Sequence, residues 1–496
     1  MSSIRGVKIS QLTSLTSLTK MVERINDILK KPLIDRLAPW LIVTIAAILR
    51  LWNLGYPQKL VFDETYYVKD AWTLWNTGAE RAWPADDNAA LEAGNASGYL
   101  ADPSFVVHPP LGKWIIGLGM WLFGPGNAFS WRISVAVLGI ASVALIMVIA
   151  LRLFKSKSWA LVAGFLFAID GHAIVLARTA LLDGILMFFV LLAFYFLLKD
   201  QRSRVLENHS WNRPWLLAAG LTLGAATAVK WSGLYFIAAF GIYVVVSEVL
   251  ARKAAGDRYW IVDGIAKQGF IDFLYLVPTA ALVYLMSWVG WIISPTGYDR
   301  QVSSNWFESL IKYHQDAYAF HVGLRTPHSY ASNPLTWIFE IRPTSFFYDS
   351  LKEGMGGCTS VGGCSSAITA LGNPLIWWPA AIALFFLAAW YFRTRERVAG
   401  LILLGIAAGW LPWIAFMGRT VFQFYSIVFL PFSILALIFV IRLFVDRAKR
   451  PIMARGLVLG YLILAGLASA FFLPIWIGTW VPYGFWLAHM WLPSWI

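Results

Sequence analysis

The sequence predicts an all-α polytopic membrane protein with about eleven transmembrane helices. Of its 496 residues, 59% are hydrophobic and only 14% are charged, whereas soluble domains carry about 25% charged residues. The mean hydropathy is +0.63, and many apolar runs reach the roughly 20 residues that a spanning helix needs. The 27 Trp and 19 Tyr residues suit the aromatic belts at membrane interfaces.

The basic charge does not indicate nucleic-acid binding. The formal net charge is +13, but the Lys and Arg residues are spread over short segments between apolar runs. We also expect no cleavable signal peptide. The first apolar run begins near Pro39, after a basic leader, and ends at Leu51-Trp52 without a small-residue cleavage site.

Residues 1–37 form a Ser/Thr-rich, basic leader. Its apolar residues follow helical spacing, and they are Leu12, Leu15, Leu18, Met21, Val22, Ile25, Ile28 and Leu29. The pattern fits an amphipathic helix on the cytoplasmic face, and a frayed tail fits it equally. We expect the transmembrane domain over residues 38–473 and a Trp-rich tail at the outer interface over residues 474–496.

Eleven apolar runs define the predicted spans. They cover residues 38–56, 128–153, 158–176, 181–198, 214–230, 233–251, 270–293, 375–392, 398–416, 420–442 and 456–473. With the N-terminus inside, the inner segments carry 26 of the 40 Lys and Arg residues, as the positive-inside rule requires. We therefore predict a multi-pass protein of the plasma membrane with a cytoplasmic N-terminus.

Two outer segments are long, residues 57–127 and 294–374. Within the first, residues 111–124 are apolar but short for a span, which favours an interfacial or re-entrant helix. The second holds the only cysteines, Cys358 and Cys364. Outside the membrane a disulfide between them is favoured over two free thiols. Zinc is not expected, because no second Cys pair or closely spaced His pair accompanies them.

Charged residues gather at the predicted outer ends of the spans. The acids are Asp63, Glu64, Asp70, Asp170 and Asp183, and the bases are Arg132, Arg178, Lys230, Arg342 and Arg419, with His108, His321 and His328 nearby. Arg50 and Lys113 can be explained as interfacial anchors, whose long side chains reach from the apolar helix to the membrane surface. Arg132 and Lys230 are flanked by apolar helix, so each should face protein or a water-filled cavity.

Cations and carboxylates at one membrane depth suit group transfer from a lipid phosphate. The cations would hold the phosphate and stabilise the charge that builds on it as it leaves. One carboxylate would take the proton of the incoming hydroxyl, an effect worth about 100- to 10,000-fold. Asp63, the first acid after the first span, is the candidate base.

An ordered set of motifs resembles the protein O-mannosyltransferases, and most of all their actinobacterial members. The motifs are Asp63-Glu64, His108-Pro109-Pro110-Leu111-Gly112-Lys113, Trp131-Arg132, Ala177-Arg178-Thr179-Ala180-Leu181-Leu182-Asp183, Val229-Lys230-Trp231-Ser232-Gly233, His328-Ser329-Tyr330-Ala331-Ser332, Trp337 with Arg342-Pro343, Gly372-Asn373-Pro374 with Trp377-Trp378, and Arg419 with Phe422 and Tyr425. The resemblance covers about residues 38–445. The Asp-Glu pair alone is a weak signal, but the ordered set is specific.

The resemblance implies a GT-C glycosyltransferase fold and a single inverting displacement. The donor would be a polyprenyl phosphate mannose, and the acceptor a Ser or Thr hydroxyl of an exported polypeptide. The Sec translocon is a candidate partner, membrane lipids surround the chain, and the active site is extracytoplasmic. No cofactor is expected. No metal is expected either, because Lys and Arg suffice to neutralise the leaving phosphate.

The resemblance also carries roles for single residues. Asp63 matches the base, and Glu64 and Arg132 match a required acid and arginine that we expect to pair. The donor-binding candidates are His108, Lys230, Arg342, Arg419 and Tyr425. Two readings stay open for Tyr425, which either lines the lipid groove or is an ordinary interfacial tyrosine. The supporting residues are Arg178, Asp183, His328 and Trp337; Arg178 and Asp183 either lock two helices together or serve the site.

Departures and alternatives remain. The second outer segment is too short for the β-trefoil-type repeats of eukaryotic members, and residues 86–98 are either a spacer or an acceptor-side flap. The nearest rival function is a related enzyme that moves another sugar from the same carrier, such as an aminoarabinose transferase acting on lipid A. A lipid-linked sugar transporter or flippase is less favoured, because the charges gather at one face and no inverted repeat is evident.

Overall fold

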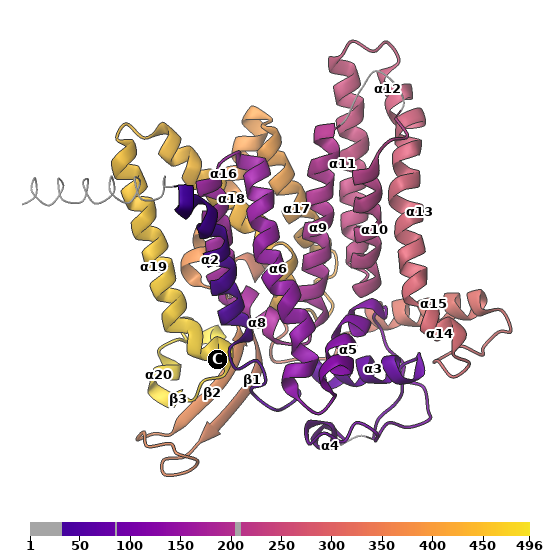
Figure 1. The fold of residues 1–496 in the computed structure, drawn as a ribbon, viewed down its shortest axis with the longest axis vertical. Coiled ribbons are helices and arrows are strands. Elements are labelled where there is room, and N and C mark those ends of the chain that lie inside the picture. Colours follow the sequence, from indigo (N-terminus) through magenta and orange to yellow (C-terminus); the bar gives the residue numbers. More distant parts are fainter. Residues whose placement is uncertain (1–31, 85–86, 204–209) are drawn as a thin grey trace, which may run out of the picture.

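The computed structural model describes residues 32–84, 87–203 and 210–496. Most of the predicted leader, residues 1–31, lies outside the described residues. The long helices run side by side as a bundle (Figure 1). They are α2 (Pro32–Leu51), α6 (Ala128–Phe154), α7 (Lys157–Ile169), α8 (Gly171–Arg178), α9 (Leu182–Ser203), α10 (Pro214–Val229), α11 (Gly233–Ala254), α13 (Gly269–Ser287), α16 (Pro374–Thr394), α17 (Arg397–Ile414), α18 (Leu430–Arg447) and α19 (Pro451–Ile477).

Every predicted span interval overlaps a helix of this bundle, but many boundaries differ; α2, for example, covers Pro32–Leu51 rather than residues 38–56. The run 420–442 becomes helical only at Leu430, where a proline at the first turn starts α18. The run 270–293 breaks at Trp288. Helix α19 continues past residue 473 to Ile477, so the tail begins later. By length and composition, seven helices of the described residues can cross a membrane, or eight if α7 and α8, bent by 60°, form one span. A total of eleven stays a prediction.

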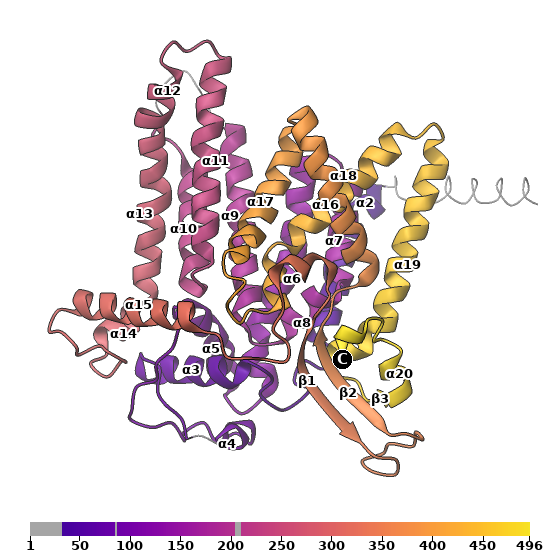
Figure 2. The same cartoon turned by 180° about the vertical axis from the view of Figure 1, so that it is seen from behind.

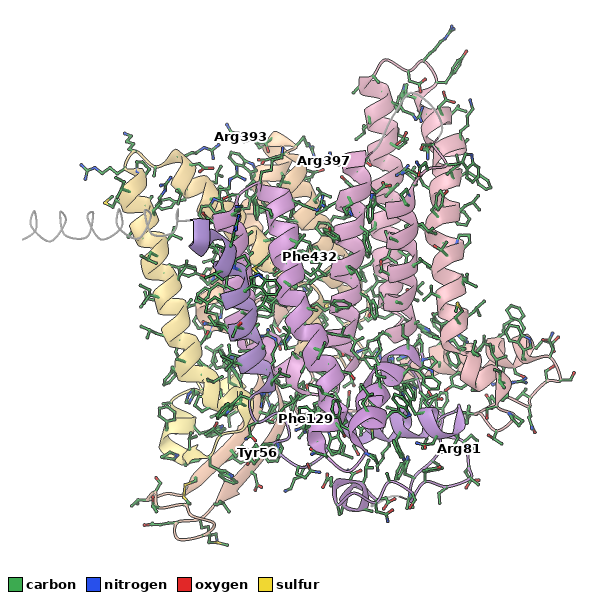
Figure 3. All side chains as sticks on the ribbon, in the orientation of Figure 1. Tyr56, Arg81, Phe129, Arg393, Arg397 and Phe432 are labelled. Atoms are coloured by element: carbon green, nitrogen blue, oxygen red, sulfur yellow. A yellow bond between two sulfur atoms is a disulfide. The ribbon has the colours of Figure 1, made fainter. Side chains whose placement is uncertain are left out.

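Both long outer segments lie at the same end of the bundle (Figures 1 and 2). The first contributes α3 (Glu64–Thr77), α4 (Asn88–Glu92) and α5 (Leu111–Phe123), and the second contributes α15 (Trp306–Gly323) and the 3₁₀ helix η2 (Pro334–Phe339). The short helix α14 (Val289–Ile293) directly precedes the second segment. Helix α5 fills the predicted short apolar run. In Figure 3, Tyr56, Arg81 and Phe129 mark this end, and Arg393 and Arg397 mark the opposite one.

The second outer segment also folds into a small sheet, which the sequence analysis did not predict. Strands β1 (Thr344–Leu351), β2 (Cys364–Ala370) and β3 (Val481–Pro482) are antiparallel in the order β1-β2-β3. The aromatic run within β1 is typical of strands. Cys358 and Cys364 form a disulfide with their Cα atoms 5.8 Å apart. The remaining short elements are α12 (Trp260–Val262), the π helix η1 (Asp263–Gln268), the 3₁₀ helix η3 (Gln423–Val428), α20 (Tyr483–Leu487) and η4 (Pro493–Trp495).

The C-terminal tail folds against the end of the bundle that carries both long segments, and its place at the membrane interface stays a prediction. Strand β3 pairs with β2, and the indole of Trp495 donates to the carbonyl of Glu340 at 2.7 Å. Within the bundle, close aromatic packing forms the core. Phe432 of α18, labelled in Figure 3, meets Phe194 of α9 at 5.0 Å between ring centroids.

Two cations assigned to interfacial anchoring are instead buried. Arg50 is fully buried and donates to the carbonyl of Ala168 at 3.0 Å. Lys113 is also buried, and its ammonium contacts Glu80 at 2.5 Å and Asp70 at 3.9 Å. Anchoring was wrong for both, because each side chain turns inward to carbonyl or carboxylate partners that short-range sequence patterns do not reveal.

Candidate active site

A tight turn separates the side chains of Asp63 and Glu64. Phe62 has a positive φ of 50°, which bulky residues adopt rarely. Helix α3 begins directly after it, with Asp63 as its N-cap. An N-cap Asp usually accepts a hydrogen bond from the first turn, but Asp63 makes no side-chain capping bond. Its carboxylate is therefore not used to stabilise the helix.

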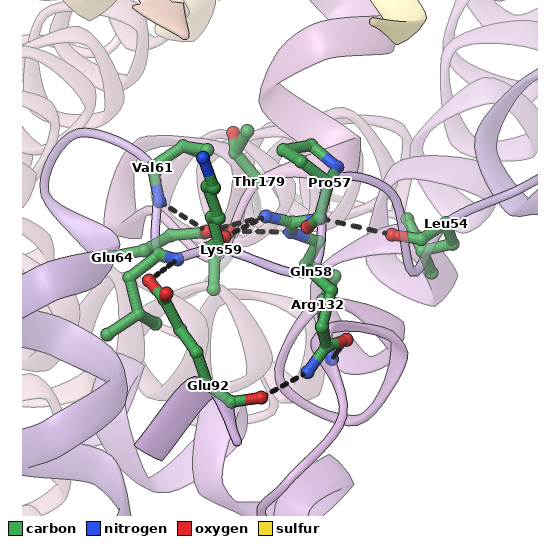
Figure 4. A network of polar contacts seen from close by, with 12 residues as sticks. Leu54, Pro57, Gln58, Lys59, Val61, Glu64, Glu92, Arg132 and Thr179 are labelled. Carbon is green, nitrogen blue, oxygen red and sulfur yellow. Dashed lines mark hydrogen bonds and ion pairs between the residues drawn. The ribbon is translucent and has the colours of Figure 1, made fainter. Parts of the chain in front are cut away.

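Glu64 is locked in a buried ion pair with Arg132 of α6 (Figure 4). The guanidinium holds both carboxylate oxygens at 2.8 Å. Glu64 also accepts from the backbone N–H of Val61 and Ala180. The other donors of Arg132 reach the carbonyls of Leu54, Pro57 and Lys59. Glu64 and Arg132 thus tie the turn before α3 to α6, the pairing expected from the sequence.

The segment leading into this turn has a second brace. The carboxylate of Glu92 accepts from the N–H of Leu60 at 2.7 Å, and Gln58 donates to the carbonyl of Glu92 at 2.9 Å. Both contacts are drawn in Figure 4. Residues 87–98 are therefore not a mere spacer, because α4 holds the chain that carries Asp63.

Asp63 has few partners of its own. It is half-buried, and within the described part of the chain its side chain accepts one hydrogen bond, from the hydroxyl of Tyr67, one turn along α3, at a long 3.5 Å. Burial raises the pKa of Asp63 to about 6, against the opposing charge of Lys230. A carboxylate with a raised pKa and few hydrogen bonds is suited to accept a proton near neutral pH.

The turn between α10 and α11 places Lys230. The N–H of Gly233 donates to the carbonyl of Lys230 at 2.9 Å, and a Cβ at Gly233 would lie 2.5 Å from the backbone nitrogen of Thr227. Only glycine fits such a close approach. The ammonium of Lys230 holds both oxygens of Asp183, at 2.9 and 3.0 Å, and lies 4.1 Å from the ring centroid of Tyr425.

Lys230 lines a cavity of about 110 Å³ between the bundle and α15; Asp63 and Tyr67 are not part of its wall. Its polar lining comes from His108, Lys230, His321 and Arg419, and aromatic rings, including those of Trp231 and Tyr425, complete the wall. The ring of Tyr67 on α3 is 6.1 Å from that of His108. Four sequence segments far apart along the chain thus meet at one small cavity.

The two histidines of the cavity are neutral near pH 7. Burial lowers the pKa of His321 to about 4, with Arg419 adding to the effect. Burial also puts the pKa of His108 well below its usual value. Since Nε2 of His321 contacts the carbonyl of Val107 at 2.8 Å, its Nδ1 is free to accept from Arg419 at 2.9 Å. The positive charge therefore rests on Lys230 and Arg419.

Two buried side-chain nitrogens of the cavity wall, Nδ1 of His108 and Nε of Arg419, have no hydrogen-bond partner among the described residues. Buried polar atoms are nearly always satisfied, so this pair points to a polar ligand. An anion suits it, because Lys230 and Arg419 both carry positive charge.

A separate apolar groove runs along α11 and α17. Its volume is about 940 Å³. Ala239 and Trp410 line the groove one helical turn beyond Tyr235 and Trp413 of the cavity. At the far end, the groove reaches Arg397. The two hollows together suit a ligand with a charged head and a long apolar chain.

The structure does not bring every predicted residue to the cavity. Arg342 does not line it; its guanidinium donates to the carbonyls of Ser329 and Ser494. Arg178 does not pair with Asp183 and donates instead to carbonyls at the end of α2, including that of Trp52 at 2.7 Å. Arg178 thus joins α8 to the end of α2, and Asp183 joins α9 to Lys230 at the end of α10.

The other supporting residues are aromatic. His328 is exposed and packs on Phe62 and Phe422. Trp337 is fully buried, donates to Ser332 at 2.9 Å and packs on Tyr425. Tyr425 is buried against Lys230, so the reading as an ordinary interfacial tyrosine is wrong.

Two contributors were missed as site residues. Tyr67 lies one turn after Asp63, a spacing that puts both on one helix face and could have been noticed. His321 was seen near the site but not assigned to it, because no local pattern relates it to Arg419, 98 residues away. Among the described residues, no group of three His, Cys, Asp or Glu residues could hold a metal ion. The expectation that no metal is needed stays a prediction.

The chain matches two family models over most of its length. Residues 40–291 match the dolichyl-phosphate-mannose-protein mannosyltransferase family, and residues 306–495 match the C-terminal four-transmembrane region of protein O-mannosyltransferase. The chain belongs to the protein O-mannosyltransferase family. This membership supports the leading reading over the aminoarabinose transferase and the transporter.

Bacterial relatives of the family match end to end. The polyprenol-phosphate-mannose–protein mannosyltransferase of Mycobacterium tuberculosis is 32% identical, with 93% of each chain covered. The proteins of that name from Mycolicibacterium smegmatis and Corynebacterium glutamicum are 33% and 32% identical, over 93% and 88% of this chain and 94% and 88% of theirs.

Solved structures agree on the fold. The Saccharomyces cerevisiae Pmt1-Pmt2 complex bound to the sugar donor aligns with a TM-score of 0.71 at 15% identity, covering 93% of this chain and 92% of the yeast chain. The archaeal oligosaccharyltransferase AglB from Archaeoglobus fulgidus aligns with a TM-score of 0.50 at 14% identity, covering 89% and 56%. The predicted GT-C fold is confirmed.

Proposed function

We propose that this chain transfers mannose from a polyprenyl phosphate mannose to a Ser or Thr hydroxyl of an exported polypeptide. The observation that carries the proposal is the uncapped carboxylate of Asp63, which contacts Tyr67, whose ring lies 6.1 Å from that of His108 in the wall of the cation-lined cavity. The bacterial relatives, which are polyprenol-phosphate-mannose–protein mannosyltransferases, support the donor and the protein acceptor.

The donor would lie across the cavity and the groove. Its phosphate would meet Lys230, Arg419 and the unpaired Nδ1 of His108. Charge-assisted hydrogen bonds of this kind are among the strongest in proteins. The prenyl chain would follow the apolar groove between α11 and α17. Two oxygens of Asp183 hold Lys230, and an ammonium has a third donor for the phosphate.

The transfer would be a single displacement at the anomeric carbon. The acceptor oxygen forms the new C–O bond while Asp63 takes its proton. The bond from the anomeric carbon to the phosphate oxygen breaks, and its electron pair leaves with the polyprenyl phosphate. Lys230 and Arg419 would stabilise the charge that develops on this phosphate. One displacement inverts the anomeric configuration.

The same proposal places the site outside the cytoplasm. The inner loops carry most of the Lys and Arg residues under the predicted orientation. Asp63 and both long segments lie at the other end of the bundle (Figure 1). In the plasma membrane, that end would meet unfolded chains leaving the Sec translocon, which we propose as a partner.

The direct test is a transfer assay with purified protein. The protein is incubated with labelled polyprenyl phosphate mannose and a peptide that contains one Thr, and the modified residue is mapped by mass spectrometry. We expect label on the Thr side chain and none on the matched Thr→Ala peptide. Label transfer to lipid A instead of peptide, or transfer of aminoarabinose but not mannose, would contradict the proposal.

A further inference from the structure

The small outer sheet has one covered edge and one open edge. On one side, β3 pairs with β2 through Cys364–Pro482 and Ser365–Val481. On the other side, no strand of the described chain pairs with the outer edge of β1. An open edge presents unpaired N–H and C=O groups, which readily pair with another extended chain.

The inner end of β1 lies next to the candidate base. A β-bulge falls between Ser345 and Phe347, and the extra residue, Phe346, stacks on Phe62 with 5.0 Å between ring centroids. Phe62 directly precedes Asp63. Bulges are frequent beside active sites because they redirect a side chain. Here the bulge joins the strand to the turn that carries Asp63.

The outer part of β1 runs away from the bundle, on the side of the sheet nearer α3 and α4 (Figures 1 and 2). Tyr348 and Ser350 are exposed in this part. At roughly 3.3 Å per residue, the eight-residue strand is about 26 Å long. Its edge therefore leads from the outer aqueous space toward Asp63.

The first outer segment meets the sheet through side chains and leaves this edge unpaired. The hydroxyl of Tyr56 contacts that of Ser366 at 3.3 Å, and Lys59 reaches Asp349 at 3.8 Å. The N–H of Ser350 donates to the carboxylate of its neighbour Asp349 at 2.9 Å. This local bond satisfies one main-chain donor that an incoming strand could otherwise use.

We propose that the acceptor polypeptide binds as an additional strand on the outer edge of β1, which carries its Ser or Thr to Asp63. The inference rests on the proposed function, which requires a polypeptide at this end of the bundle. Main-chain hydrogen bonds supply affinity in strand addition, while only alternate side chains face pockets. Such binding accepts many sequences and demands an extended chain.

Peptides with N-methylated backbones test the pairing. Every second residue of an added strand donates its N–H to the edge strand. We expect methylation of residues in one register to raise the peptide KM at least tenfold and methylation in the other register to change it less than twofold. The donor KM should stay constant throughout.

The outcomes separate the two proposals. If the unmethylated peptide is not mannosylated, the proposed function fails. If it is mannosylated but methylation has the same effect in both registers, strand addition is wrong and the function stands.

A protein variant locates the edge. Ser350→Pro replaces the N–H that Asp349 already holds with a ring on the edge of β1, so it obstructs an incoming strand without removing a donor that this strand would use. Ser360→Pro alters the loop of the same hairpin. We expect only Ser350→Pro to raise the peptide KM, with the donor KM unchanged. An unchanged peptide KM in folded Ser350→Pro would overturn the assignment to β1. If that variant does not fold, the proposal is tested by the methylated peptides alone, through the difference in peptide KM between the two registers.

Discussion

Asp63 and Glu64 are chain neighbours in opposite situations. Glu64 is fully buried, and its two oxygens accept from the Arg132 guanidinium and two backbone N–H groups. Asp63 is half-buried, makes no side-chain capping bond at the start of α3 and, among the described residues, accepts a hydrogen bond only from a distant tyrosine hydroxyl. The carboxylate of Glu64 has all its hydrogen bonds within the fold, whereas that of Asp63 remains available to accept a proton. Two adjacent acids of one dipeptide thus have different roles.

The cations repeat this contrast. The donors of Arg132 are all committed to carbonyls and to Glu64, which makes it a brace. Arg419 contacts a neutral histidine and keeps a buried Nε without a partner in the described chain. The two arginines thus differ in their unsatisfied donors, and they also differ in burial: Arg132 is fully buried, whereas Arg419 is half-buried.

The largest effect should come from Asp63→Asn. The amide keeps the shape of the side chain but cannot accept the hydroxyl proton, so we expect mannosyl transfer to fall by about 100- to 10,000-fold. The melting temperature and donor binding should barely change, because Asp63 has little role in stability. The rate of peptide mannosylation, measured beside a thermal unfolding curve, checks both. Near wild-type turnover would remove Asp63 as the base.

Glu64→Gln should show the reverse pattern. Breaking a buried ion pair from one side leaves an uncompensated charge, which costs about 3–5 kcal/mol. We expect a clearly lowered melting temperature and less folded protein, and the activity per folded molecule should fall much less than in Asp63→Asn. A variant as stable as wild type that has lost all turnover would assign the chemistry to Glu64 instead.

The sequence predicts those site residues that stand in local motifs, and it does not predict contacts between residues that are far apart along the chain. Asp63, Glu64, Lys230 and Arg419 were found because each stands in a recognisable motif at the outer end of a span. The pairing of Glu64 with Arg132 also followed from the family pattern. The membrane fold followed from apolar runs, which are a strong signal because lipid requires internally bonded helices.

The rest could not be predicted, because it depends on tertiary contacts. The partners of Arg50 and Lys113 come from other helices, so a local pattern cannot distinguish a buried cation from an anchoring one. Strand β1 pairs with a segment whose apolar and polar residues do not alternate. The place of Arg342 beside the C-terminal tail is likewise visible only once the chain is folded.

Arg419→Ala and Arg342→Ala compare an arginine in the cavity with one outside it. Losing a charge-assisted hydrogen bond costs about 1.5–3 kcal/mol, so we expect the donor KM of Arg419→Ala to rise by about 10- to 100-fold. Arg342 donates to backbone carbonyls instead, and its variant should keep the donor KM within about twofold. Titrating donor lipid at fixed peptide measures both. An equal increase of the donor KM in both variants would indicate that Arg342 also binds the phosphate.

Near neutral pH, the smallest change in kcat/KM should come from varying the pH itself. Asp63 must be deprotonated to accept a proton, and its pKa is raised to about 6. Below this value the carboxyl is protonated, so kcat/KM should fall about tenfold for each pH unit; above it, kcat/KM should level off. His108 and His321 are neutral on both sides of the transition, since burial lowers the pKa of each. The variant His321→Gln distinguishes titration of Asp63 from titration of the histidine, because it removes the imidazole and keeps a polar group beside Arg419. An unchanged inflection near pH 6 in that variant assigns the titration to Asp63, and its disappearance would assign it to the histidine.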